Sequence, residues 1–179
     1  MATILRLLGL PELERDGARI TLAAERHCQL GAYVALRADW VQRDTLADLF
    51  YPERNHDAAR SNLRKLLSQL RSDRDLDAQL QESGTALRWT IDTDVAQLQA
   101  AAAGRDAQRI VDLYRGPLLD GLGVSASPAF AEWLGFERQR LHAVWRDAAL
   151  RLLDDGADRA ELAARIVAAD PLDEVALRG

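Results

Sequence analysis

Short apolar runs fill the first twenty residues of the chain. Residues 4–22 hold one compact run, ILRLLGL, which Pro11 interrupts because proline removes a backbone donor. Asp16-Gly17 then lies between LER and ARITL, and this dipeptide is typical of a tight hairpin turn. We therefore predict short strands joined by a hairpin in this segment.

The apolar spacing becomes helical after residue 24. Cys28, Ala32 and Leu36 recur at the spacing that places side chains on one side of a helix. Asp44 suits the N-cap of a second helix, and Asn55 or Asp57 suits that of a third, because short polar side chains accept from free N–H groups. The pattern predicts helices at residues 24–39, 45–51 and 58–71.

A second hairpin and a set of helices are predicted in the rest of the chain. Residues 80–92 alternate around Ser83-Gly84, whereas no period-two pattern follows residue 94. Ser127-Pro128 is a strong helix start, because Ser caps and Pro is favoured at the first helical position. The predicted helices are a pair within 96–116 broken at Gly104, a long one after Pro128 that stops at Gly156, another over 159–169, and a last one begun after Pro171.

The order of these elements is a strand pair, three helices, a hairpin and then helices alone. A small sheet, three helices and a terminal hairpin make a winged helix, in which the third helix is the recognition helix and the hairpin is the wing. Tandem antiparallel helices are the signature of a helical repeat array. We therefore predict an α+β winged helix-turn-helix domain over residues 1–93 and an all-α domain over residues 94–179.

The predicted third helix has an apolar side and a cationic side. At 3.6 residues per turn, one side carries Ala59, Leu63, Leu66, Leu67 and Leu70. The opposite side carries Ser61, Arg64, Lys65 and Ser68, with Arg60 and Arg71 on its flank and no acidic residue. Arg and Lys can donate to guanine O6 and N7, Ser can reach several base edges, and flanking Arg can neutralise phosphates. This face is the predicted DNA-binding surface.

Two of these assignments have an ordinary structural alternative. A basic helix face is commonly no more than solvated surface, since Arg is a good helix former. The order of the elements favours DNA binding for the helix. Arg88, in the second hairpin, is a candidate phosphate or minor-groove contact from the wing, or else an exposed strand residue paired with Asp92 or Glu82. The sequence leaves the role of Arg88 open.

The long helix predicted after Pro128 has a broad apolar side. It carries Trp133, Leu134, Phe136, Leu141, Val144, Trp145 and Leu152. We expect most of these residues to form the core of the repeat, because neighbouring helices must bury each other's faces. Glu137, Arg138 and Arg140 are expected to make surface or interdomain pairs of small individual energy.

The net charge of −5 is distributed unevenly along the chain. Residues 1–75 carry 12 Lys and Arg against 11 Asp and Glu, whereas residues 76–179 carry 11 against 17. A nucleic-acid-binding domain needs a basic face and not a basic total. A neutral half followed by an acidic half indicates two tasks in two domains.

Several functional classes find no support in the sequence. The apolar stretches are too short and too often interrupted to cross a membrane, and the N-terminus is not a signal peptide. Cys28, the single cysteine, cannot form an internal disulfide, which fits a reducing cytoplasm. The histidines lack metal-ligand spacing, and the chain has neither a nucleophile elbow nor a phosphate-binding glycine loop. We expect a cytoplasmic protein that is not an enzyme and holds no metal or cofactor.

Four segments resemble a known family of bacterial regulators. FYPERNHDAARSNLRKLLSQLR (residues 50–71) resembles the segment around the recognition helix of SARP-type regulators, which are named for antibiotic regulatory proteins. LRLLGLPELERDGARITL (5–22) resembles their first strands. DLYRGPLLDGLGVSASPAFAEWLGFERQRLH (112–142) and AADPLDEVALR (168–178) resemble the bacterial transcriptional activator domain, or BTAD, that follows in this family. The resemblance covers nearly the whole chain.

The resemblance implies an OmpR-like winged helix followed by a TPR-like domain. Members of the family bind direct promoter repeats as pairs and recruit RNA polymerase, so it implies double-stranded DNA, RNA polymerase and a second copy as partners. The base-reading positions would lie on the helix of Ser61, Arg64, Lys65 and Ser68. The family's helical domain usually continues past DPLDE, so we expect a truncated one here. The alternative is a TPR-like protein-interaction adaptor without DNA binding, against which the acid-free basic face argues.

Overall fold

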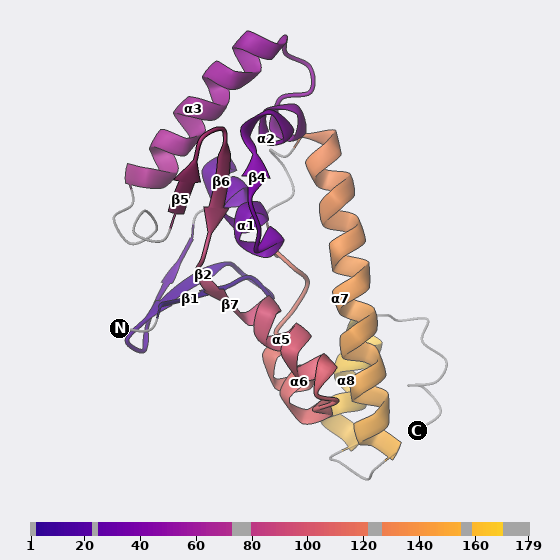
Figure 1. The fold of residues 1–179 in the computed structure, drawn as a ribbon. Coiled ribbons are helices and arrows are strands. Elements are labelled where there is room, and N and C mark those ends of the chain that lie inside the picture. Colours follow the sequence, from indigo (N-terminus) through magenta and orange to yellow (C-terminus); the bar gives the residue numbers. More distant parts are fainter. Residues whose placement is uncertain (1–2, 23–24, 73–79, 122–126, 155–158, 170–179) are drawn as a thin grey trace.

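The computed structural model describes residues 3–22, 25–72, 80–121, 127–154 and 159–169. It combines two small sheets with helices in a mixed α and β fold, and helices make up most of its second half (Figure 1). The predictions that concern Gly156 and the helix after Pro171 lie outside the described residues.

A four-stranded sheet forms around the first strand. Strands β1 (Thr3–Arg6), β2 (Glu12–Arg15) and β3 (Ala18–Thr21) pair in antiparallel succession, and β7 (Asp92–Thr93) joins β1 in parallel. Asp16 and Gly17 both have positive φ, 49° and 85°, which is the backbone of a type I′ hairpin turn. The hairpin predicted at this dipeptide is therefore confirmed.

Three helices follow at the predicted places: α1 (Arg26–Arg37), α2 (Arg43–Phe50) and α3 (His56–Ser72). Asn55 is the cap of α3, because its Oδ1 accepts from the Ala58 N–H at 2.9 Å. The prediction of Asp44 as a cap is wrong. Asp44 lies inside α2, whose N-cap is Gln42, and its carboxylate pairs with Arg60 of α3.

The second sheet has the strand order β4-β6-β5, with all pairs antiparallel. Its strands are β4 (Val41–Gln42), β5 (Leu80–Ser83) and β6 (Ala86–Trp89). Ser83 pairs with Ala86, so the hairpin turn is Gly84-Thr85, one residue later than predicted. This sheet packs closely on α1: a Cβ on Gly31 would lie 2.7 Å from the Trp89 ring, so glycine is required at that contact.

Helices α5 (Asp94–Ala103), α6 (Ala107–Leu113), α7 (Pro128–Asp154) and α8 (Arg159–Ala169) complete the fold. Within the described part of 94–169 there is no strand, only an isolated bridge between Leu8 and Leu118. The predicted break at Gly104 is confirmed, since Gly104 is the C-cap of α5. The Ser127-Pro128 start is also confirmed, because Ser127 Oγ accepts from the Phe130 N–H at 3.1 Å.

Helix α7 connects the two halves of the molecule. Figure 1 shows it running from beside α2 to α6 and α8. At its start, the Phe130 ring lies 5.2 Å from that of Phe50, and the Trp133 ring meets Tyr33 edge-on at 4.7 Å. Farther along, Trp145 is buried in the same continuous cluster of apolar side chains. The hydrophobic core therefore passes from the first half into the second without a gap.

The sequence-based prediction of the apolar side of α7 is wrong for one residue. Leu134, Leu141 and Trp145 are buried as expected, whereas Phe136 is 65% exposed. Residues of an α-helix are about 100° apart around its axis, so Phe136 lies about 200° from Leu134 and faces away from the core. An apolar side chain at the wrong phase cannot join the buried stripe.

The segment after α6 docks on the residues that follow β1, and we call this contact the joint (residues 7–10 with 115–121). Leu119 N–H donates to the Leu7 carbonyl at 2.8 Å, and Asp120 N–H donates to the Gly9 carbonyl at 3.0 Å. In return, the Gly9 N–H donates to the Pro117 carbonyl at 3.0 Å. The RGPLLDG sequence (115–121) therefore serves to attach the helical half to the first sheet.

Asp94, the first residue of α5, also stabilises the joint through hydrogen bonds. It is 1% exposed, and its carboxylate accepts from the N–H groups of Leu7 at 2.8 Å and Leu8 at 3.1 Å. Burial raises the pKa of Asp94, and the two amides and Arg115, whose Nη2 lies 3.7 Å from the carboxylate, act in the opposite direction.

Candidate nucleic-acid interface

Helix α3 divides into the two sides that the sequence predicts. The buried residues are Ala59, Leu63, Leu66, Leu67 and Leu70, which pack against α1 and α2. Ser61, Arg64, Lys65 and Ser68 are exposed. Because the apolar stripe anchors α3 to two helices, the opposite side is held outward as a rigid polar surface.

The two flanking arginines hold α3 in place. Arg60 donates from Nε and Nη2 to both carboxylate oxygens of Asp44 on α2, at 2.6 and 2.7 Å. This two-bond geometry is the strong form of an Arg–carboxylate pair, and it lowers the pKa of Asp44 and raises that of Arg60. Arg71, at the other end of α3, pairs with Glu82 on β5, which also accepts from Arg43 at 2.8 Å.

The two central cations of α3 have no such partners. Arg64 and Lys65 form no hydrogen bond or ion pair with any other residue that the structure describes. Both residues lie between Arg60 and Arg71 along α3. Arg64 follows Arg60 by about one helical turn, and Lys65 precedes Arg71 by more than one turn. Of the predicted DNA-binding set, Arg64 and Lys65 are therefore the cations with free donors, and Arg60 and Arg71 position the helix that carries them.

Arg88 takes neither of the partners that the sequence suggested. Its guanidinium donates to Gln81 Oε1 at 2.8 and 3.2 Å and lies 4.8 Å from the centre of the Trp40 ring. The register explains this choice, since Gln81 is directly opposite Arg88 on β5. Glu82, one residue on, points to the other face of the sheet, where it meets Arg71.

A cavity of about 230 Å³ opens between the start of α2, helix α3 and the hairpin turn. Its wall includes the side chains of Arg43, Arg60 and Arg64, the carboxylate of Asp44 that pairs with Arg60, and the turn residues Gly84 and Thr85. The Nε atom of Arg43 is buried and has no hydrogen-bond partner among the described residues. The cavity places cationic donors beside the exposed face of α3.

The sequence misses the residues that orient this face. Asp44 and Glu82 are far from their arginine partners along the chain, and no local pattern predicts either pair. Trp40 is 38% exposed and supports Arg88, but its position before a two-residue strand gives no signal of that role. Gln81 is the exception, because a hairpin turn at Gly84-Thr85 places it directly opposite Arg88 on the neighbouring strand.

Neither a metal site nor a membrane span is found in the described residues. Nowhere in that part of the chain do three or more His, Cys, Asp or Glu side chains come together as a metal ion would require. None of the described helices combines the length and apolar character that a membrane span needs.

Comparison with known proteins finds a similarity among solved structures. No protein family and no curated protein matches the chain. Among solved structures, the chain is similar to Mycobacterium tuberculosis EmbR in complex with a low-affinity phosphopeptide, with a TM-score of 0.58 and 22% sequence identity. The similarity covers 97% of this chain and 52% of that one, so this chain spans about half the length of EmbR. At this identity the comparison shows a shared fold.

Proposed function

We propose that this chain is a sequence-specific DNA-binding transcription regulator of the SARP type. Residues 1–93 form its OmpR-like winged helix-turn-helix domain, with α3 as the recognition helix and the β5–β6 hairpin as the wing. Residues 94–179 form its BTAD, a TPR-like helical domain. The fold shared with EmbR across nearly the whole chain supports this assignment.

A single observation carries the proposal. Arg64 and Lys65 lie on an exposed helix face whose single acid within α3 is Asp57 in the first turn, and they have no protein partner among the described residues. In an acidic protein such cations ordinarily find carboxylates, as Arg60 and Arg71 do. A face that keeps its cations unpaired on a rigid helix suits the major groove, where guanine offers O6 and N7 as acceptors.

The family resemblance extends the proposal to partners. The regulator binds direct repeats in promoters as a pair, contacts RNA polymerase as an activator, and works in the cytoplasm. Ser61 and Ser68 supply further base-edge contacts, and Arg88 supplies a phosphate contact from the wing. The cavity beside Arg43 and Arg64 receives a backbone phosphate of the same duplex.

The test is selection of bound duplexes from a random DNA pool, followed by affinity measurements on the selected site. Arg64→Ala should weaken specific binding by about 1–3 kcal/mol if Arg64 contacts one guanine with two hydrogen bonds. Arg151→Ala is the matched control, because Arg151 is an exposed arginine at the far end of α7. Equal losses for both variants would show that the binding face lies elsewhere.

The competing function is an adaptor that binds proteins and no DNA. The 65% exposed Phe136 favours it, because a large apolar side chain on an outward helix face suits a protein contact. A mobility-shift assay on random duplex DNA at low salt separates the two functions. A salt-dependent shift supports the regulator, whereas no shift at any concentration tested supports the adaptor.

A further inference from the structure

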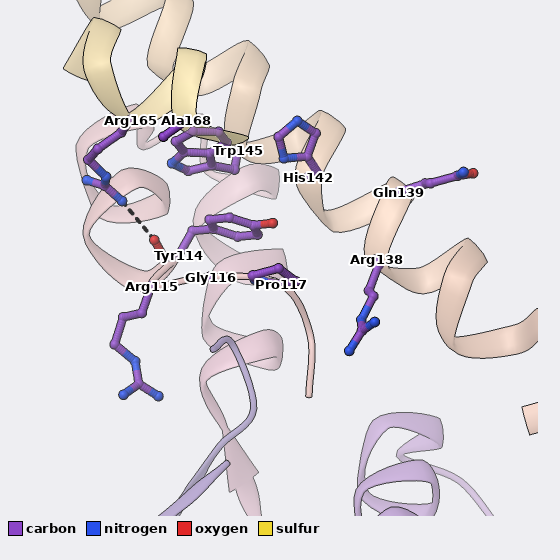
Figure 2. A pocket seen from close by; sticks show the side chains of 10 residues that line it. All are labelled: Tyr114, Arg115, Gly116, Pro117, Arg138, Gln139, His142, Trp145, Arg165 and Ala168. Carbon is purple, nitrogen blue, oxygen red and sulfur yellow. Dashed lines mark hydrogen bonds between the residues drawn. The ribbon is translucent and has the colours of Figure 1, made fainter. Parts of the chain in front are cut away.

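A second cavity, of about 550 Å³, lies in the helical half and is remote from the proposed DNA face. Its walls come from the segment after α6, from α7 and from α8, and Figure 2 shows its side chains. A volume of this size is within the range of pockets that hold small organic ligands. The cavity takes no part in the function proposed above.

The floor and one wall of this cavity are aromatic. Tyr114 stacks on Trp145 with ring centres 5.0 Å apart and an angle of 18° between the rings. His142 lies 5.3 Å from Trp145 and 6.2 Å from Tyr114, and Pro117 continues the apolar surface. Tyr114 is 6% exposed and Trp145 is 1% exposed, so the stack is a rigid and mostly covered apolar wall, against which a planar ligand can pack.

The polar groups of the cavity are cationic or neutral. Its described lining includes Arg115, Arg138 and Arg165 and no Asp or Glu, and of these Arg115 pairs with Glu12 at 2.7 Å. Arg138 donates from Nε and Nη2 to the carbonyls of Leu118 and Leu119, both at 2.7 Å. A guanidinium has five N–H donors, so these bonds fix Arg138 and leave it donors for a ligand.

Three side chains with hydrogen-bond donors, Tyr114, Arg138 and His142, line this cavity. In Figure 2 the Tyr114 hydroxyl points into the space between His142 and Arg138. Burial raises the pKa of Tyr114, and the charge of Arg138 acts in the opposite direction. A hydroxyl, an imidazole and a guanidinium around one space form a donor set for a carboxylate.

We propose that this cavity binds a small planar organic carboxylate, with its ring on Tyr114 and Pro117 and its carboxylate between Arg138 and His142. The binding site is also part of the joint. Pro117 lines the cavity and accepts from the Gly9 N–H, while Arg138 holds the carbonyls of the next two residues. A bound carboxylate therefore strengthens the attachment of residues 115–121 to residues 7–10.

Calorimetric titration of the full chain with 2-naphthoate tests the site, and the test does not depend on DNA binding. We expect saturable binding of one molecule per chain, weakened at least about ten-fold by His142→Ala and by Arg138→Gln. Arg140→Gln is the matched control: Arg140 is on the same helix, outside the cavity, in an exposed pair with Glu137. It should bind 2-naphthoate as the unaltered chain does. Because Arg138→Gln also loses a loop contact, His142→Ala carries the conclusion if Arg138→Gln fails to fold.

Two further measurements complete the test. The neutral 2-naphthamide should bind at least about ten-fold more weakly than 2-naphthoate, because it lacks the charge that Arg138 recognises. Hydrogen exchange of the Leu119 and Asp120 amides should slow when 2-naphthoate is bound, since both amides donate across the joint. No saturation at millimolar 2-naphthoate, equal binding of the amide, equal effects of His142→Ala and Arg140→Gln, or unchanged exchange with the ligand bound would each overturn the proposal.

Discussion

Asp94 offers the sharpest test of how the two halves are attached. Its carboxylate accepts from the N–H groups of Leu7 and Leu8, and Asp94 is only 1% exposed. Asp94→Ala leaves both amides buried without an acceptor, and each such amide costs about 1–3 kcal/mol. The substitution also removes a buried carboxyl, whose ionised form is disfavoured by burial, as its raised pKa indicates. This offsets part of the loss in the free energy of unfolding.

The expected loss in the free energy of unfolding is therefore about 2–4 kcal/mol for Asp94→Ala. Asp94→Asn should lose about half as much, because its amide oxygen can still accept from one N–H while its NH₂ group faces the other. Urea unfolding at neutral pH, followed by tryptophan fluorescence, measures both. With a urea dependence of about 2 kcal/mol per molar, Asp94→Ala should lower the midpoint by roughly 1–2 M.

Asp92→Asn is the control for this series, because Asp92 is an exposed acid two residues earlier. Its free energy of unfolding should stay within about 0.5 kcal/mol of that of the unaltered chain, as is usual for surface substitutions. If Asp94→Ala is no more destabilising than Asp92→Asn, the hydrogen bonds to Leu7 and Leu8 do not hold the joint, and the reasoning is refuted.

Three other predictions follow from the described contacts. Ser127→Ala should lose about 1–2 kcal/mol of unfolding free energy in urea, because Ser127 both caps α7 and donates to the Leu49 carbonyl of α2; a loss below that of Asp92→Asn would contradict it. Arg60 lowers the pKa of Asp44, so the stability that this pair supplies is present above the usual carboxyl pKa and lost as pH falls through the lowered one. Asp44→Asn should therefore be less stable than the unaltered chain at neutral pH and equal to it in acid, which urea titrations across pH can show. On a direct-repeat site, inserting about 5 bp between half-sites should abolish cooperative DNA binding and inserting a full turn should partly restore it, measured by mobility shift; cooperativity indifferent to spacing would leave independent monomers.

Local patterns predict most of the elements because their causes are local. The Asp16-Gly17 turn, the Asn55 and Ser127 caps and the apolar stripe of α3 each depend on residues a few positions apart. The exposed positions of Ser61, Arg64, Lys65 and Ser68 follow from the same helical period. For these residues, sequence and structure agree because tertiary contacts do not alter the local preference.

The errors arise where a distant partner decides the outcome. Asp is a residue type that commonly caps helices, yet the Asp44 carboxylate accepts a hydrogen bond from Arg60 of α3, sixteen residues later. Phe136 is apolar but out of phase with the buried residues of α7, which a count of apolar side chains does not reveal. The joint is farther still from local pattern, because Asp94 and Leu119 meet residues 7–9 across more than eighty positions. No spacing rule connects such segments.

The structure also relates the helical half to the orientation of the basic face. Helix α7 begins at Ser127, whose hydroxyl is bonded to the Leu49 carbonyl of α2, and its Phe130 packs on Phe50 of the same helix. Helix α2 in turn carries Asp44, which holds Arg60 on α3 with two bonds. A shift of α7 must therefore be absorbed either in the α2 contacts or by movement of α2 itself, because packed helices do not deform continuously. In the second case, Arg64 and Lys65 move with α3, so under the proposed function the helical half can set the angle at which these two side chains meet DNA without contacting it.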